Sequence, residues 1–141
     1  MIQNIIDAIS MKIDELYPEA KIRDEEIKQG LECPCFYIHL IDLDYKQYIG
    51  NRFFLSQPFQ IVYFPKEDSN DEMNGVLFNL LPGLRRIKLL DGQLLNGTKL
   101  RGQVIDGVVQ FSVNYDVFMR ELPEQKEKME GIEVNGETQG A

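Results

Sequence analysis

The sequence predicts a single α+β domain in which a mixed or mostly antiparallel sheet is flanked by two helices. Two segments repeat their apolar residues at helical spacing, and six others have the alternation or the short apolar runs of strands. The chain has 141 residues, 43% of them hydrophobic, which suffices for one buried core. The predicted element order is α-β-β-β-α-β-β-β.

The first segment predicts an amphipathic helix from Ile2 to Leu16. The residue before a proline avoids helical backbone angles, so Pro18 ends this helix. Its polar side carries too few lysines to bind an anionic membrane, and we therefore assign the apolar stripe to the core. The stripe consists of Ile2, Ile5, Ile6, Ile9, Ile13 and Leu16.

A charged strand and a central strand are predicted next. The charges of Lys21–Ile27 favour an edge position, and Gln29-Gly30 predicts a turn. The segment Cys35–Tyr45 is apolar on both faces near its start, which places it centrally in the sheet. Its far end, with Asp42 and Asp44, is expected to emerge into solvent.

The third predicted strand spans Arg52–Phe64. Pro58 interrupts it, which predicts a bulge or an edge position. Alternate residues form the main core row, and Phe54, Val62 and Phe64 lie on the opposite face. The core row consists of Phe53, Leu55, Phe59, Ile61 and Tyr63.

The second helix is predicted to begin at a capping box, Ser69-Asn70-Asp71-Glu72, and to end at Pro82-Gly83. A hydroxyl followed three residues later by a carboxylate can satisfy two free amide groups of the first turn. The apolar stripe of this helix consists of Met73, Val76, Leu77, Leu80 and Leu81.

Three strands are predicted to follow the second helix. Their ranges are Arg86–Leu90, Leu100–Ile105 and Val108–Met119, separated by Asp91-Gly92, Asn96-Gly97 and Asp106-Gly107. The first two dipeptides predict turns. The third is the strongest hairpin signal in the chain.

The segment from Glu121 to Ala141 has a different composition. It holds six glutamates and two lysines, few large apolar residues and no periodicity. We therefore predict that residues 1–120 form the domain and that residues 121–141 are an acidic mobile tail.

The overall charge excludes some classes of function. The net charge is −8, which makes nucleic-acid binding through phosphate contacts a poor hypothesis. No signal peptide opens the chain, and no apolar run reaches the ~20 residues of a membrane span. We expect no membrane association, and reduced thiols in an intracellular compartment.

The pair Cys33-Pro34-Cys35 has the wrong spacing for a zinc site and for a C-x-x-C redox motif. We interpret both as thiols buried in a strand. His39 is the single histidine, and about 13 Å of extended chain separates it from Cys35. No nucleophile pairs with it, so we interpret it as a hydrogen-bonded sheet residue.

Two carboxylate clusters could serve glycosidase or nuclease chemistry, but neither has a metal-loop spacing. They are Asp42-Leu43-Asp44 and Asp24-Glu25-Glu26, and we interpret both as solvated. The basic cluster Arg85-Arg86-x-Lys88 could hold a carboxylate of a partner subunit. No phosphate loop is present, and we predict neither catalysis nor a cofactor.

Short motifs recur along nearly the whole chain in an order that resembles one family. They are Leu16-Tyr17-Pro18, Gln29-Gly30-Leu31, Pro34-Cys35-Phe36, Arg52, Pro58-Phe59, Tyr63-Phe64-Pro65, Asn96-Gly97-Thr98, Leu100-Arg101-Gly102 and Asn114-Tyr115-Asp116-Val117-Phe118. The chain resembles the tail terminator (tail completion) family of phages, prophages and phage-tail-like bacteriocins of Gram-positive bacteria. The tail after Glu121 is outside this resemblance.

The resemblance implies a small α+β fold and a structural role without catalysis. Six copies would form a ring on the head-proximal end of the tail tube, stop its polymerisation and offer a surface to a head connector, or to a sheath in contractile particles. DNA would pass through the lumen without specific binding. The particle, and the bacterial cytoplasm during assembly, are the expected locations.

A ring needs contact surfaces, and we take Phe54, Val62 and Phe64 as the candidate subunit interface because they lie opposite the main core row. Two alternatives remain open. The chain could be another head-tail joining or minor tail protein. It could also be a non-catalytic module that binds a nucleotide or peptide on an exposed sheet face.

Overall fold

A computed structural model describes residues 1–23, 33–67, 69–121 and 132–135. The described elements are α1 (Ile2–Leu16), β1 (Lys21–Arg23), β2 (Cys35–Leu40), β3 (Asp44–Gln47), β4 (Arg52–Ser56), β5 (Pro58–Phe64), α2 (Asn70–Leu84), β6 (Arg86–Lys88), β7 (Leu94–Ile105), β8 (Val108–Tyr115), β9 (Val117–Glu121) and β10 (Ile132–Asn135). The Gln29-Gly30 turn and the Asp24-Glu25-Glu26 cluster lie outside the described residues. No helix in the described part is long and apolar enough to cross a membrane.

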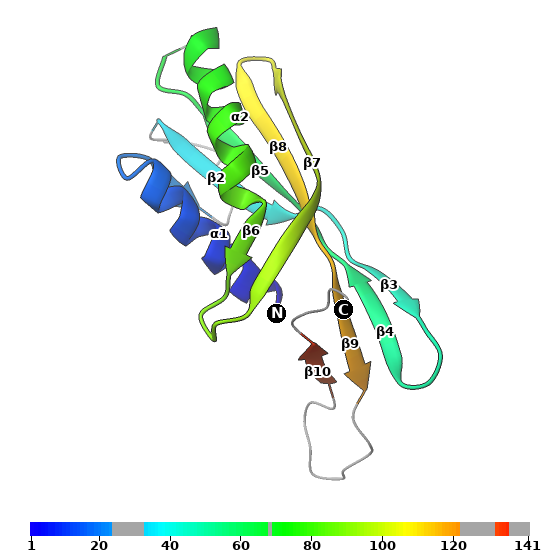
Figure 1. Ribbon diagram of the computed structural model, residues 1–141. Helices are drawn as coiled ribbons and strands as arrows, with labels where there is room; N and C mark the ends of the chain where they lie inside the picture. The colour runs from blue at the N-terminus through cyan, green and yellow to red at the C-terminus, as the bar shows by residue number, and fades with distance from the viewer. Residues whose placement is uncertain (24–32, 68, 122–131, 136–141) are drawn as a thin grey trace.

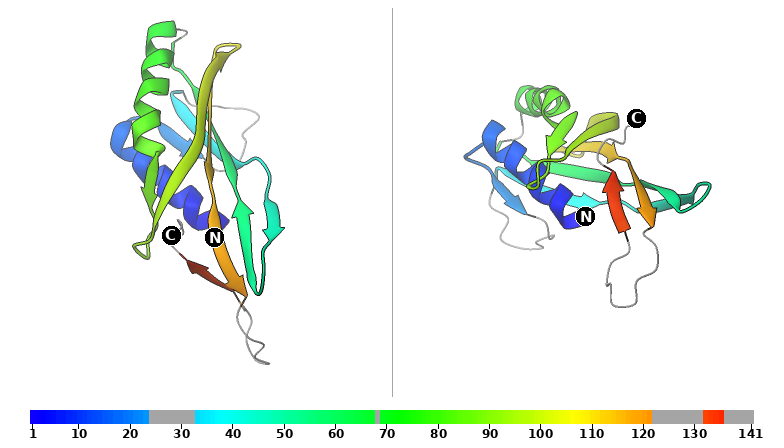
Figure 2. Two further views of the ribbon diagram at one scale, coloured as in Figure 1. Left: turned by 45° about the vertical axis from the view of Figure 1, so that its right-hand side comes forward. Right: turned by 60° about the horizontal axis from the view of Figure 1, so that its bottom comes forward.

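The strands form two sheets. A six-stranded sheet has the order β1-β2-β5-β8-β7-β6, and its β1–β2 pair is parallel while the others are antiparallel. A four-stranded antiparallel sheet has the order β10-β9-β4-β3. We call the six-stranded sheet with α1 and α2 the body, and the four-stranded sheet the arm, which projects from the body (Figures 1 and 2). The α+β class with two helices and mostly antiparallel pairing is confirmed.

The two sheets arise because three predicted strands each divide and pass from one sheet into the other. The predicted Cys35–Tyr45 strand becomes β2 and β3, Arg52–Phe64 becomes β4 and β5, and Val108–Met119 becomes β8 and β9. Pro58 does mark an interruption, but β4 and β5 each have two neighbours, so the edge alternative was wrong. The element order therefore contains more strands than predicted.

Gln57 holds the junction between β4 and β5. Its side chain is fully buried, and its Nε2 donates to the backbone oxygen of Tyr115 at 3.2 Å. The backbone nitrogen of Tyr115 donates to the Gln57 carbonyl at 3.0 Å. These bonds join the two strand pairs at the point where the sheets separate.

The core lies between α1, α2 and one face of the six-stranded sheet. Phe36, Phe59 and Phe111 come from three neighbouring strands and are almost completely buried there. The predicted stripe of α1 packs on them, although Leu16, at its end, is 38% exposed. As predicted, β1 is an edge strand and β2 lies inside the sheet.

Helix α2 begins as predicted but ends later. The Ser69 Oγ accepts a hydrogen bond from the Glu72 backbone amide at 3.3 Å. The Glu72 carboxylate accepts a hydrogen bond from the Tyr63 hydroxyl. The predicted stop at Pro82-Gly83 was one residue too early, since the helix continues to Leu84, whose side chain is fully buried. Leu81, predicted in the apolar stripe, is 48% exposed.

Strand β7 is longer than predicted because Asn96-Gly97 is part of it and is not a turn. A Cβ atom at position 97 would lie 2.6 Å from Val113 Cγ2 and 2.9 Å from the Leu84 carbonyl oxygen, so the glycine permits a close approach. The Asp106-Gly107 hairpin is confirmed, with both residues at positive φ.

The C-terminal segment differs in part from the expectation of a mobile tail. Within it, Ile132–Asn135 form β10, which pairs with β9 in antiparallel register at the edge of the arm. The predicted domain boundary at residue 120 stays a prediction.

Candidate assembly surfaces

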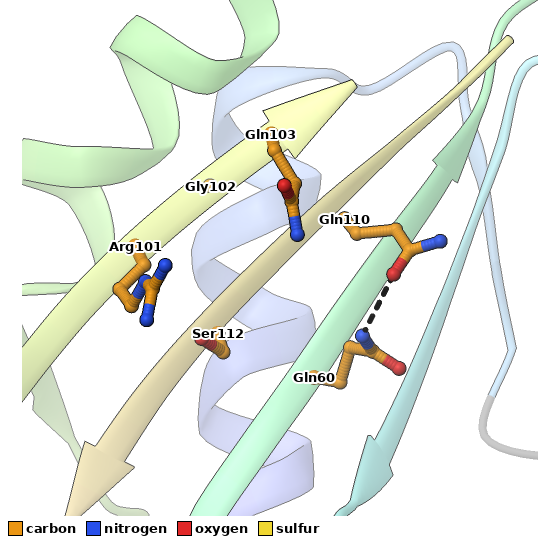
Figure 3. A pocket seen from close by; sticks show the side chains of 6 residues that line it. All are labelled: Gln60, Arg101, Gly102, Gln103, Gln110 and Ser112. Atoms are coloured by element: carbon orange, nitrogen blue, oxygen red, sulfur yellow. Dashed lines mark hydrogen bonds between the residues drawn. The ribbon is translucent and has the colours of Figure 1, made fainter. Parts of the chain in front are cut away.

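The face of the six-stranded sheet opposite the helices is polar at its centre. A groove of about 250 Å³ lies on this open face, lined by side chains from β5, β7 and β8 (Figure 3). The lining residues are Gln60, Arg101, Gly102, Gln103, Gln110 and Ser112. Arg101 is the one charged residue among them, so this surface is suited to hydrogen bonding.

Side chains on the open face are joined in a line across three strands. His39 Nε2 lies 2.9 Å from Gln60 Oε1, and Gln60 Nε2 donates to Gln110 Oε1 at 3.2 Å (Figure 3). With the Gln60 amide so oriented, the His39 Nε2 atom is the donor. The ring of Tyr37 stacks on the imidazole at 4.9 Å. His39 is therefore a hydrogen-bonded sheet residue, as predicted.

The two cysteines differ in environment. Cys35 is buried in β2, where burial, followed by the nearby Cys33, raises the pKa of its thiol. Cys33 is exposed, so its predicted burial was wrong; it precedes the strand instead of lying in it. In the described part of the chain, no group of three or more histidine, cysteine or carboxylate residues could hold a metal ion.

The arm carries an aromatic cluster on the face that continues the open face of the body. The ring of Phe118 lies 4.8 Å from that of Phe54 and 5.5 Å, edge-on, from that of Tyr48. The Arg52 guanidinium carbon lies 5.8 Å from the Phe118 ring centroid, within the range of a cation–π contact. No described helix covers this face, and the cluster is therefore available to a partner.

The predicted interface residues do not form one continuous patch. Phe54 belongs to β4 in the arm, whereas Val62 and Phe64 belong to β5 in the body. All three are half-buried and share the side opposite the main core row. Alternation predicted the shared side, but it gave no signal that the strand divides between two sheets.

A polar cluster lies where the body meets the arm. The Asn114 Nδ2 donates to Ser56 Oγ at 3.0 Å, and Asp116 lies beside these two residues. Burial raises the pKa of the Asp116 carboxyl, and hydrogen bonds from Ser56 and Asn114 with the charge of Lys99 oppose that rise. This cluster holds a carboxylate at the one point where β8 changes into β9.

Sequence reasoning missed a second groove, of about 470 Å³, between α1 and β6. Met11, Leu90 and Leu94 line it and are at least half exposed, and they were not assigned to any surface. Arg86 and Lys88 of the predicted basic cluster also line it. On the other side of the molecule, the solvent exposure predicted for Asp42 and Asp44 is confirmed.

Comparison with known proteins identifies a family. A family model described as "Phage tail terminator protein" matches residues 4–128, which covers α2, β1 to β9 and all of α1 except its first two residues. The match extends past Glu121, so the expectation that the tail lies wholly outside the resemblance was wrong. No curated protein matches the chain.

Proposed function

The chain belongs to the phage tail terminator family, and we propose that it forms a closed ring, most simply a hexamer, that caps the head-proximal end of a tail tube. Membership assigns the chain to the phage tail and to virion assembly. The ring would stop polymerisation of the tube and present its other side to a connector or collar. The role requires no catalysis.

The arm is the observation that supports this proposal. A closed ring uses heterologous contacts, in which one patch meets a different patch on the neighbouring copy. The cluster of Tyr48, Phe54 and Phe118 is an apolar surface outside the core, and aromatic residues are typical anchors of interfaces. We therefore retain Phe54 as an interface residue, and we assign Val62 and Phe64 to the same contact where it extends over the body.

The partners follow from the position of the ring. One side of it would bind the tail tube protein, and the other the head connector, with the sheath as a further partner in a contractile particle. Assembly would take place in the cytoplasm of a bacterium that carries a phage or prophage, or that produces a phage-tail-like bacteriocin.

DNA would pass through the lumen without specific binding, since a chain of net charge −8 repels phosphates. The open face of the body is not the source of that repulsion. Its described strand positions include the cations Lys21, Arg23 and Arg101 and no carboxylate. The lumen would therefore be lined by other, acidic surfaces.

Replacing Phe54 by aspartate tests the proposal. We expect Phe54→Asp to fold and yet to leave tails of uncontrolled length in electron micrographs. Phe78→Asp is the matched control, because Phe78 is 78% exposed on α2, away from the arm. A folded Phe54→Asp variant with tails of normal length would exclude Phe54 from the ring contact, and an unfolded one would assign Phe54 to the core.

The groove on the open face favours the second candidate function, a non-catalytic ligand-binding module. Calorimetric titration with nucleotides and with peptides distinguishes the two candidates. Saturable binding that Arg101→Ala abolishes would support the module, whereas the ring proposal predicts no such binding.

A further inference from the structure

Strand β6 is an edge of the six-stranded sheet, and among the described residues no other strand pairs with its outer side. The backbone oxygen of Arg85 accepts a hydrogen bond from the Gly97 amide of β7 at 2.6 Å, and the Leu89 amide donates one to the Gln93 carbonyl at 2.8 Å. The backbone groups of both residues therefore point away from the outer side of β6. Backbone groups alternate in direction along a strand, so those of Arg86 and Lys88 point to the outer side. An edge of this kind is a template on which another strand can add.

The surroundings of β6 define what kind of strand would fit. On the helix side lies the groove between α1 and β6, with Ala8, Met11 and Ile87 among its lining residues. Arg86 and Lys88 also line this groove, but their exposed side chains alternate with the buried Ile87 and therefore point to the opposite side of the sheet. A complementary strand would therefore alternate apolar residues with acidic ones.

The segment Ile41–Asp44, which leads from β2 into β3, has this alternation. Ile41 and Leu43 are 48% and 50% exposed, although both are large aliphatic residues. Asp42 and Asp44 are exposed between and after them. The segment continues into β3, which is itself an edge of the arm and is exposed at every position.

We propose that Ile41–Asp44 of one copy adds as a strand to β6 of the next copy in the ring. Residues directly opposite each other in paired strands share a face, so Asp42 and Asp44 would face Arg86 and Lys88. Ile41 and Leu43 would then point to the other face, into the groove between α1 and β6. This contact rests on the ring proposed above and adds two complementary patches to the arm residues already assigned to the ring contact.

The positions of the two patches suit a closed ring. In Figure 1, the β6–β7 connection and α1 lie on one side of the molecule, and the β2–β3 connection and β3 lie on the other, and both views of Figure 2 agree. A heterologous ring needs such an arrangement, because each copy must contact one neighbour with each side. The pairing also covers the exposed edge of β6 and the exposed side chains of Ile41 and Leu43 with one contact.

Charge reversal tests the contact. One variant carries Asp42→Lys with Asp44→Lys, and the other carries Arg86→Glu with Lys88→Glu. Each alone would place like charges opposite each other and lose the ring. An equimolar mixture would restore it, because copies can alternate around a ring with an even number of subunits and every contact then pairs opposite charges. Native mass spectrometry of wild type, each variant and the mixture measures the result, with circular dichroism to confirm folding.

Disulfide trapping detects the contact even when it is transient. In a Cys33→Ser background, a Leu43→Cys chain is mixed under oxidation with a Met11→Cys chain or with a Phe78→Cys chain. We expect cross-linked dimers with position 11, which lines the groove on α1, and a yield several-fold lower with position 78, although Phe78 is more exposed than Met11 (78% against 54%).

The outcomes separate this inference from the proposed function. Equal yields at positions 11 and 78, or reversal variants that still form wild-type rings, would overturn the strand addition while leaving the ring intact. A wild-type chain that neither forms rings nor controls tail length would contradict the proposed function itself.

Discussion

Three continuous chain segments contribute one strand each to the body and to the arm, but the two regions differ in what covers their strands. Phe111 in β8 is almost completely buried under α2, whereas Phe118, on β9 a few residues later, lies in a cluster that no described helix covers. In the body, the alternation of a strand separates the core from a polar face. In the arm, aromatic residues occupy both faces, with Tyr45 against Phe53 on one and Phe54 against Phe118 on the other. The comparison supports the proposal that the body holds the fold and that the arm serves assembly.

Truncating one aromatic side chain in each region gives the largest expected difference. Phe111→Ala removes a ring from the packed core and is expected to lower the free energy of unfolding by about 3–5 kcal/mol. Phe54→Ala removes aromatic pairing worth about 0.5–1.5 kcal/mol, together with the partial burial of the ring, and should cost less than Phe111→Ala. Urea denaturation measures both. Equal losses would show that the arm is as much a part of the core as the body.

The close approach at Gly97 gives the next largest effect. Gly97→Ala would force a methyl group against the Leu84 carbonyl, which is backbone and cannot rotate away, and should cost about 1–3 kcal/mol. Gly75→Ala is the control, since a Cβ there meets nothing within 4 Å. Because alanine favours the helix over glycine, this variant should be more stable than wild type by up to about 1 kcal/mol. A Gly97→Ala variant as stable as wild type would contradict the packing of β7 on α2.

Truncation after Arg120 tests whether the C-terminal segment supports the body. It removes β10, whose main contacts are with β9 in the arm. We expect the melting temperature to fall by less than roughly 5 °C, which corresponds to about 1 kcal/mol for a domain of this size. A larger fall in differential scanning calorimetry would place part of the removed segment on the core.

The carboxylate at the junction gives the smallest expected effect, and it depends on pH. Because the pKa of Asp116 is higher in the folded than in the unfolded chain, its ionisation lowers stability as pH rises through the raised value. Asp116→Asn should therefore be more stable than wild type at neutral pH, and the difference should shrink as the solution is acidified below that pKa. A difference that grows on acidification would contradict the assignment.

Local patterns predicted the parts of this fold that local interactions determine. The stripe of α1, the Ser69 cap and the Asp106-Gly107 hairpin each depend on residues close together in the sequence, and all were predicted correctly. Phe54, Val62 and Phe64 were correctly placed on one side of their strand, because alternation continues unbroken across Gln57.

The rest depends on contacts between distant residues, which no local pattern reveals. The Asn96-Gly97 dipeptide predicts a turn, yet Gly97 lies within a strand, where the close approach of Leu84 and Val113 leaves no room for a Cβ atom. The division of strands between body and arm depends on pairing partners, and Pro58 was its one local signal. The groove beside β6 combines α1 with a strand some seventy residues away, so Met11 and Leu94 could not be associated from the sequence.

Amide hydrogen exchange, compared between the free chain and the chain assembled on tail tubes, tests the division of roles most directly. We predict that amides of β5 and β8 are protected in both states, while those of β3, β4 and β6 gain protection on assembly. The contradicting result would be arm amides that exchange equally in both states while the exposed surface of α2 becomes protected.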